Sequence, residues 1–487
     1  MPDIRSPGSM PCSAMLCHPA ETVQLRSGGA MLAEGVRARD KEVAVKRRRG
    51  HKAVLELTSE QVTVLDQQGH AARAMWNLLH DWWTMAGTCP QRRASPTLAD
   101  QHIRRARREL PWLADLPAQA AQQVLQAYFQ AWKNCWEGRA AAPAFKSRIR
   151  SRMSVDVPQA RDLHIKRLTR RWGQVRIPKV GLVRFRWTKD LPGTTRSAPP
   201  GRVTGARLVR ETHGWHIVFR TEVLTEAPLP HLGPGVGIDL GIAKPLALSD
   251  GTFREHASWA TPGERARMTR LERKAARQRQ ARKPGAPASR RLTRTYDQIA
   301  RYRATAKRRT TDWQHRTTTE LADTFGVIGM EDLAISNMIK SARGAVDAPG
   351  HRVRQKAGLN RAITAEAWAR TSAFLTYKLE QRGGHLIKVP AMNTSRRCHV
   401  CGLTTPGGRE SQARFACKNP LCGWSGNADT NAACNIQFLT QQRAPQDIEG
   451  ARTWSPSHQA GNEASTTLDS HPQAQGISWP RPERMSK

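Results

Sequence analysis

Four cysteines in this sequence have the types and spacing of a metal site. They form two pairs, Cys398-x2-Cys401 and Cys417-x4-Cys422. Four thiolates at this spacing can close a tetrahedral zinc site, and a site whose ligands all come from the protein is structural. The second pair is wider than the usual two-residue knuckle. His399 is a spare ligand, but its place inside the first pair favours a side chain that points away.

Three acidic residues, Asp239, Glu331 and Asp429, form a second candidate site. Taken singly, Asp239 could cap a loop, Glu331 could cap a helix and Asp429 could be a helix N-cap. Together they offer hard oxygen ligands, which suit Mg²⁺ or Mn²⁺. Two such ions about 4 Å apart would activate a water and stabilise the leaving oxygen of a phosphodiester. Only a fold could bring together residues so far apart in the sequence.

The segment around Asp239 predicts a strand that continues into a hairpin. Val236, Ile238 and Leu240 alternate with Gly237 and Asp239, which is the period of a strand and places the Asp in its middle. A desolvated carboxylate there needs a partner or a metal. The apolar run 246–248 then ends at the turn signal 249–251. We therefore expect a hairpin that presents one carboxylate.

The other two acids also lie at the ends of predicted elements. A strand is expected over 325–330, directly before Glu331, and another over 385–389. A helix is expected over 362–382, and a last helix begins near Asn427, which places Asp429 in its first turn.

A basic helical stretch separates the first two acids. Thr261, Pro262 and Glu264 have the spacing of an N-cap, an N1 proline and an N3 glutamate, and helical sequence follows to about Thr310 with a break near Pro284. Arginine and lysine cover most of it. A solvated surface helix would mix both signs of charge, so the scarcity of acids favours contact with a nucleic-acid backbone.

The sequence pattern of the N-terminal half changes twice, from strand to helix and back to strand. Residues 42–57 predict a strand interrupted by a basic turn at 46–49, and 58–61 resembles a capping box. Helical spacing follows to about Trp136, and the tryptophans of this block are assigned to its core. Short strands with a basic face then predict a small β-barrel. They are expected over 175–177, 182–187, 203–209 and 215–222. The helical block is therefore interpreted as an insertion into the barrel.

Composition restricts the partner class. The 487 residues leave room for about three domains, and 78 Lys and Arg against 40 Asp and Glu give a net charge of +38. The basic residues are spread along the chain, which favours a long nucleic-acid contact track over a basic tail. No apolar run is long enough to span a bilayer, and no signal peptide is recognised. The other cysteines are scattered, which favours a reducing compartment.

The boxes IDLGI at Asp239, GMEDL at Glu331 and ADTNAACNI at Asp429, with the cysteine loop before the last, resemble the TnpB proteins of insertion sequences. They resemble equally the compact type V CRISPR effectors descended from TnpB. The resemblance covers roughly residues 42–440. It implies an α+β multidomain fold with Asp239, Glu331 and Asp429 as the Mg²⁺-binding acids of a RuvC nuclease on a ribonuclease H-like fold.

The resemblance also implies a domain plan. It comprises a wedge β-barrel (41–57 and 143–230), a helical recognition domain (58–142), a RuvC-like nuclease (231–392 and 427–441) and a zinc-binding loop (393–426), between a disordered leader (1–40) and tail (442–487). The implied partners are a guide RNA and double-stranded target DNA with a short flanking motif, read by base pairing in the bacterial cytoplasm at the nucleoid.

Several functions remain open at this point. The main prediction is a transposon-associated, RNA-guided DNA endonuclease, and a compact type V CRISPR effector is its alternative. A binding-dominated, RNA-guided repressor with weak cleavage would keep the same sequence features, although the presence of all three acids argues against it. A DNA-strand transposase shares the idea of an acidic triad, but the barrel and the cysteine loop before the last acid disfavour it.

Overall fold

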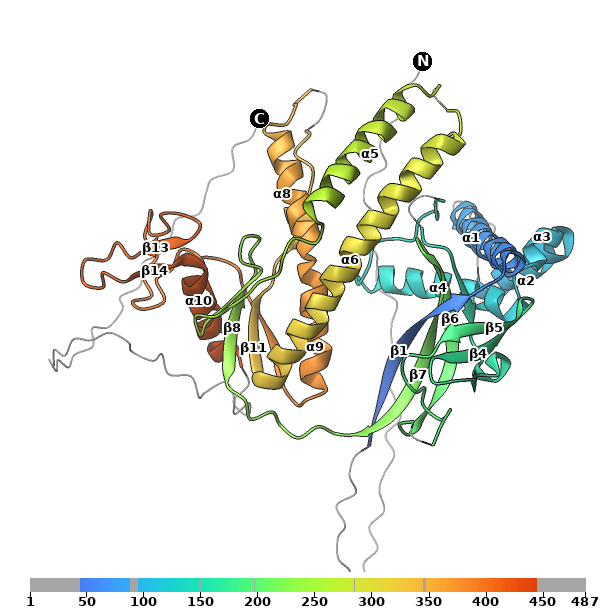
Figure 1. The fold of residues 1–487 in the computed structure, drawn as a ribbon, viewed down its shortest axis with the longest axis horizontal. Helices are drawn as coiled ribbons and strands as arrows, with labels where there is room; N and C mark the ends of the chain where they lie inside the picture. The colour runs from blue at the N-terminus through green and yellow to red at the C-terminus, as the bar shows by residue number, and fades with distance from the viewer. Residues whose placement is uncertain are drawn as a thin grey trace, which may run out of the picture. The chain divides into compact units, whose positions relative to one another are not determined.

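The computed structural model describes residues 44–87, 95–148, 151–196, 198–283, 285–344 and 347–444 (Figure 1). The expected disordered leader, and all but the first three residues of the expected tail, lie outside these described residues. None of the described helices is long and apolar enough to cross a membrane.

An antiparallel sheet of seven strands contains the strands predicted for the N-terminal half. Its order is β2-β6-β7-β1-β5-β4-β3. The strands are β1 (Ala44–Glu56), β2 (Ser154–Val157), β3 (Lys166–Arg167), β4 (Trp172–Ile177), β5 (Gly181–Arg186), β6 (Gly201–Glu211) and β7 (Gly214–Glu226). β2 and β3 are the two ends of this order, and the predicted small β-barrel stays a prediction. The 3₁₀ helix η1 (Ala160–Leu163) contacts β4 and β6, and its Leu163 is fully buried.

The predicted basic turn at 46–49 is wrong, because β1 runs through it without interruption. This part of β1 pairs with β7 from Leu224 to Thr221. Glu222 on β7 forms ion pairs with Lys46 and Arg48 across the sheet. A cross-strand carboxylate therefore offsets the charge that made this segment look like a turn.

Four helices follow β1 and share one hydrophobic core with the sheet. They are α1 (Ser59–Gly87), α2 (Pro96–Glu109), α3 (Pro111–Ala114) and α4 (Ala118–Trp136). The assignment of tryptophans to this core is confirmed for Trp76, which is 8% exposed, and wrong for Trp112 and Trp136, which are 48% and 66% exposed. Trp136 ends α4 and stacks on Trp132 one turn earlier, so it covers its neighbour but has no layer above it.

A five-stranded sheet of order β10-β9-β8-β11-β12 follows. Its strands are β8 (Gly235–Asp239), β9 (Leu246–Leu248), β10 (Phe253–Arg254), β11 (Val327–Glu331) and β12 (His385–Val389). Strands β8, β11 and β12 are parallel, whereas β9 and β10 fold back antiparallel as the predicted hairpin. The expected strand at 385–389 is confirmed. β11 extends one residue further than expected and includes Glu331.

Six helices belong to this part of the chain: α5 (Pro262–Gln280), α6 (Arg290–Thr324), α7 (Ile335–Met338), α8 (Val353–Glu366), α9 (Trp368–Glu380) and α10 (Ala428–Arg443). Helix α10 packs on β8, β11 and β12. Apolar residues of α6 and α9, such as Leu321 and Leu375, share a core with strand residues such as Ile238 and Met330. The sheet is therefore covered on both faces, as its fully buried central strands require.

Two helix predictions need correction. The single helix expected over 362–382 is two helices, because Ala367 adopts a left-handed conformation with φ 52° between α8 and α9. Alanine visits this region rarely, and no glycine or proline marked the break in the sequence. The basic stretch is confirmed as two helices separated near Pro284, but α6 continues to Thr324, well past the expected end.

Candidate metal sites

Asp239 and Glu331 end two neighbouring parallel strands. β8 and β11 pair in register, with Gly237 beside Gly329 and Ile238 beside Met330, so the two acids are the next residues in line. Asp239 thus lies at the end of its strand and not in the middle as expected. Side chains two residues apart share a face of a sheet, so both acids lie on the face of the two glycines. Because carboxyl ends of parallel strands meet at one edge, the acids converge there.

Helix α10 packs directly on that same face, with no side chain of the two glycines in between. A Cβ on Gly237 would lie 2.1 Å from the carbonyl oxygen of Ala433, and one on Gly329 would lie 1.9 Å from Oγ1 of Thr440. Any side chain at either glycine would push the helix away from the sheet. The two glycines therefore fix how closely α10 approaches the acids. Each glycine precedes its acid by two residues in the sequence, a spacing that places both on one face of a strand but that the sequence predictions did not include.

Asp429 lies in the first turn of α10, one turn before Ala433. The N-cap of the helix is Asn427, whose Oδ1 accepts hydrogen bonds from the backbone N–H of Asp429 and of Thr430. Asp429 is therefore not the N-cap, and its carboxylate is free for another role. Glu331 likewise caps no helix, because the next helix, α7, begins after Ala334 without a side-chain cap.

The three carboxylates influence each other electrostatically. Burial, followed by repulsion from Glu331 and Asp429, raises the pKa of Asp239 to about 7. Burial also raises the pKa of Glu331. Glu331 is 9% exposed and Asp429 is 8% exposed, so solvent screens them little. Two buried carboxylates that repel a third, partly buried one form a site that a divalent cation would stabilise.

Two side chains that sequence reasoning did not assign contact these acids. The Nη2 of Arg409 donates to Oδ1 of Asp429 at 3.0 Å, and its positive charge offsets part of the rise in the pKa of Asp239 and of Glu331. Thr394, which is 3% exposed, donates its hydroxyl to Oε1 of Glu331. Arg409 comes from the loop between the cysteine pairs, where no local pattern sets it apart from other basic residues.

Two asparagines of α10 connect this site to the cysteine loop. Asn431 donates to the carbonyl of Arg397 at 2.8 Å and accepts from the backbone N–H of His399 at 2.9 Å. Asn435, one turn later, donates to the carbonyl of Arg397 at 2.7 Å and to that of Thr394 at 2.9 Å. These bonds hold the segment that carries Thr394 and the first cysteine pair against α10. The motif that contains both asparagines was recognised, but not their role.

The four predicted cysteines are brought together. Their Sγ atoms all lie within 4.8 Å of one another, and Cys398–Cys422 and Cys401–Cys417 are 3.9 and 3.6 Å apart. Zn–S bonds of about 2.3 Å in a tetrahedron require sulfurs about 3.8 Å apart, so the set fits zinc. His399 is not part of this set, as expected, because its ring bonds Asn431 and packs on Trp424. The hairpin of β13 (Arg414–Ala416) and β14 (Ser425–Asn427) closes the loop.

The cysteines are the only group of this kind in the part of the chain that the structure describes. The three acids do not form such a group among the described residues. Strand register and helix placement bring them to one edge of the sheet, with Arg409 as their cationic neighbour. Their donor chemistry fits a divalent cation.

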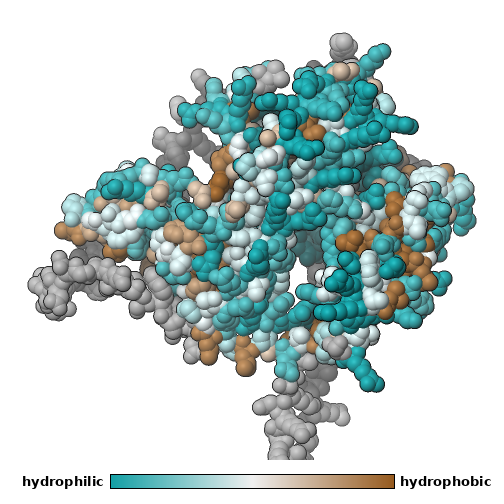
Figure 2. Space-filling view, viewed as in Figure 1, coloured by the Kyte–Doolittle hydropathy of each residue, from teal (hydrophilic) through white to brown (hydrophobic). Residues whose placement is uncertain are grey.

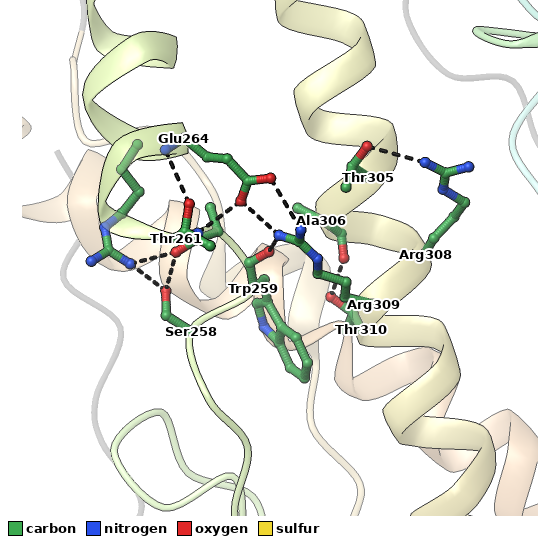
Figure 3. Close-up of polar contacts among 11 residues, drawn as sticks. Ser258, Trp259, Thr261, Glu264, Thr305, Ala306, Arg308, Arg309 and Thr310 are labelled. Carbon is green, nitrogen blue, oxygen red and sulfur yellow. Dashed lines mark hydrogen bonds and ion pairs between the residues drawn. The ribbon is translucent and has the colours of Figure 1, made fainter.

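The helices α5 and α6 form a highly basic antiparallel pair, and Figure 2 shows hydrophilic side chains over both. Their interface is small and contains Leu271, Ala275, Leu292 and Ile299. Thr261 caps α5 through the predicted capping box with Glu264. Arg309 of α6 also bonds Glu264, through Nη1 at 2.6 Å and Nη2 at 3.0 Å (Figure 3). This fork connects the base of α5 to α6 and leaves the basic faces exposed.

Comparisons with known proteins place these features in a family. A family model described as "Probable transposase" matches residues 218–342, which contain Asp239 and Glu331. A second model, "Cas12f1-like, TNB domain", matches residues 368–436, which contain the four cysteines and Asp429. The chain is 34% identical over 328 residues to InsQ of Escherichia coli (strain K12), named as a candidate RNA-guided DNA endonuclease, and the match covers 67% of this chain and 76% of InsQ. The chain belongs to the TnpB family.

Other relatives of this TnpB-family chain agree with that membership. A protein of Streptomyces pristinaespiralis, also named as a candidate RNA-guided DNA endonuclease, is 27% identical over 387 residues, which cover 78% of this chain and 86% of that protein. The CRISPR-associated endodeoxyribonuclease Cas12f1 of Sulfoacidibacillus thermotolerans is 45% identical over 62 residues, 13% of this chain and 14% of that protein. Among solved structures, a Cas12f1–sgRNA–target DNA complex covers 78% of this chain and 83% of its own, with 15% identity and a TM-score of 0.47.

Proposed function

We propose that this TnpB-family protein is an RNA-guided DNA endonuclease that hydrolyses phosphodiesters with divalent cations held by Asp239, Glu331 and Asp429. The observation that carries the proposal is the convergence of three carboxylates at one edge of the five-stranded sheet, where burial and repulsion from Glu331 and Asp429 raise the pKa of Asp239 to about 7. Such a perturbation costs stability and is typical of functional sites.

Divalent cations bound there would activate a water and stabilise the leaving oxygen. The chain's own residues would hold the cations in place. Thr394 orients the carboxylate of Glu331 through its hydroxyl. Arg409 would leave Asp429 as the cations bind, because a cation takes over the neutralisation that Arg409 now supplies.

The nucleic acid would be bound by the basic surfaces. The helices α5 and α6 lie between β10 and β11 in the sequence, and they contribute arginines and lysines with few acids. The fork between Glu264 and Arg309 holds the pair together and neutralises one of those few acids. A guide RNA paired with target DNA would then be gripped through its backbones, with sequence read by base pairing.

The experiment is to purify the full chain from its native locus, sequence the RNA that copurifies and assay cleavage of a target library with Mg²⁺. We expect guide-dependent cuts beside a short flanking motif, and none with Asp239→Ala protein. Guide-independent cutting, or cutting by the Asp239→Ala protein, would refute the proposal. A CRISPR array beside the gene, as opposed to transposon ends, would assign it to the Cas12f1-like branch.

A further inference from the structure

A cavity of about 210 Å³ lies where α1 and α4 meet β2 and β6, and it is not part of either candidate metal site. Four of its lining side chains are cationic, namely Arg73, Lys146, Arg152 and Arg207, whereas Asp156 is the one acid. A water takes about 30 Å³, so the cavity has room for a group several times that size. Its charge and size suit an anion.

The one acid of the cavity is already neutralised. Arg207 donates to Asp156 through Nε to both oxygens at 3.1 Å and through Nη2 at 2.9 Å. Arg220 adds a further bond from Nη1 at 3.3 Å. Asp156 also attracts the ammonium of Lys146, but one carboxylate against four cations leaves the cavity with a net positive charge.

One of the cations has a buried donor without an acceptor among the described residues. The Nε of Arg73 is buried and makes no hydrogen bond. The ammonium of Lys146, which is half-buried, lies 3.4 Å from the ring centroid of Trp76, a cation–π contact that places it beside the cavity. Burial and repulsion from Arg207 lower the pKa of Lys146 to about 8. A buried donor without an acceptor costs free energy, which a bound anion would recover.

The segment that carries Lys146 is fixed to α1 by its backbone. Asn77 accepts from the N–H of Lys146 at 2.8 Å and donates to its carbonyl at 3.2 Å. The indole N–H of Trp76 donates to the carbonyl of Ala144 at 3.0 Å. The ammonium is thus held in place before any ligand arrives, so little conformational entropy is lost on binding.

We propose that this cavity binds a backbone phosphate of nucleic acid. A phosphodiester presents oxygens to which the unpartnered Nε–H of Arg73 and the ammonium of Lys146 can donate, and charge-assisted bonds of this kind are strong. Arg152, which is exposed, extends the positive charge towards solvent. The inference rests on the proposed function only for the identity of the polyanion. RNA and DNA both carry the group, and the experiment distinguishes them.

The first test is lysine footprinting of the full chain, because an unprotected amine with a lowered pKa reacts readily with an acylating reagent. Acylation of Lys146 is measured by mass spectrometry in the free protein, with copurifying RNA, and with RNA and target DNA. Protection in the RNA arm identifies guide RNA as the source, and protection only after DNA is added identifies DNA. Absence of protection in both arms, with binding verified by gel shift, would overturn the proposal.

The second test is substitution. Lys146→Gln should weaken binding about tenfold at physiological salt and reduce the slope of log affinity against log salt by about one. Lys133→Gln, on α4 with 64% of its side chain exposed, is the matched control and should change neither. Unchanged affinity and slope for Lys146→Gln would contradict the proposal. If that variant fails to fold, Arg152→Gln carries the same expectation.

The Asp239→Ala protein separates this inference from the proposed function. It should lose cleavage yet keep the protection of Lys146, because the cavity contains none of the three acids. Retained cleavage in that variant would refute the nuclease assignment and leave the phosphate site standing. If the wild-type protein cleaves its target but Lys146 is not protected by bound nucleic acid, the phosphate site is refuted and the nuclease assignment stands.

Discussion

The cysteine site and the acidic site are held in opposite ways. The cysteines come from one short loop, their sulfurs already lie at zinc-compatible distances, and the loop has a small core of its own around Phe415. The acids come from two strands and a helix, do not form such a cluster among the described residues, and two of them repel the third. A structural metal completes a fold, whereas a catalytic metal must be able to enter a fold that exists without it.

The largest expected effect tests the acidic side of this comparison. Asp239→Ala should reduce guide-dependent cleavage at least about a thousandfold, because a shared ligand of the reactive cations is lost. Binding of RNA and DNA should remain within about twofold, since no cation of the basic surfaces changes. Single-turnover cleavage and gel shifts measure the two quantities. Asp250→Ala, on the exposed turn after β9, is the control and should cut normally.

The second prediction tests the cysteine side. Cys398→Ser should abolish bound zinc and lower the yield of folded protein, because the loop relies on the metal for its stability. Zinc content by mass spectrometry and the soluble fraction after expression are the measurements. Cys135→Ser, a cysteine outside the cluster on α4, should leave both unchanged. A Cys398→Ser protein that is fully stable without zinc would show that the cluster is not structural.

The third prediction follows from the pKa of Asp239, which lies at about 7 against an ordinary 3.8. A carboxyl group with a raised pKa in the folded state destabilises that state once it ionises, so stability should fall as pH rises from about 4 to about 7. In magnesium-free, zinc-loaded protein, Asp239→Asn should remove this fall and be more stable at pH 8 by a few kcal/mol, on the order expected for such a shift. Urea unfolding at pH 5 and pH 8 measures it.

The control for this measurement is Asp312→Asn, which changes an exposed carboxylate on α6. It should keep the wild-type pH dependence. Equal pH dependence in wild type and Asp239→Asn would mean that the pKa of Asp239 is not raised and that the contrast between the two sites is false.

The smallest effect concerns the link between the sites. Asn431→Ala removes the hydrogen bonds to Arg397 and His399. Because one hydrogen bond contributes about 1 kcal/mol net, the free energy of unfolding should fall by roughly 1–3 kcal/mol. Zinc should stay bound, because no ligand changes, while cleavage falls because Thr394 and Glu331 lose their support. Zinc content and cleavage rate are measured together. Zinc retention with unchanged cleavage would show that the two sites are independent.

The sequence predicted the elements that depend on local pattern. The alternation before Asp239, the capping box at Thr261 and the cysteine spacing each encode a local geometry, and each is confirmed. What failed depends on distant partners. The run of basic residues in β1 looked like a turn until Glu222 was placed opposite it.

The candidate site divides in the same way. The sequence identified the three acids and, through the resemblance, their grouping, but their roles stay a prediction. The contacts of Arg409 and Thr394 could not be predicted, because they arise only when the cysteine loop meets the strand ends. The left-handed Ala367 has no sequence signal either.

The two strand glycines beneath α10 have a consequence for how this chain can change. The close approach of Gly237 to the backbone of Ala433, and of Gly329 to the side chain of Thr440, locates the helix on the sheet. The apolar residues on the opposite face of the sheet are therefore free to drift in size and shape without displacing Asp429. The relative positions of the three acids therefore depend little on substitutions in that core. A single methyl group at either glycine would change them.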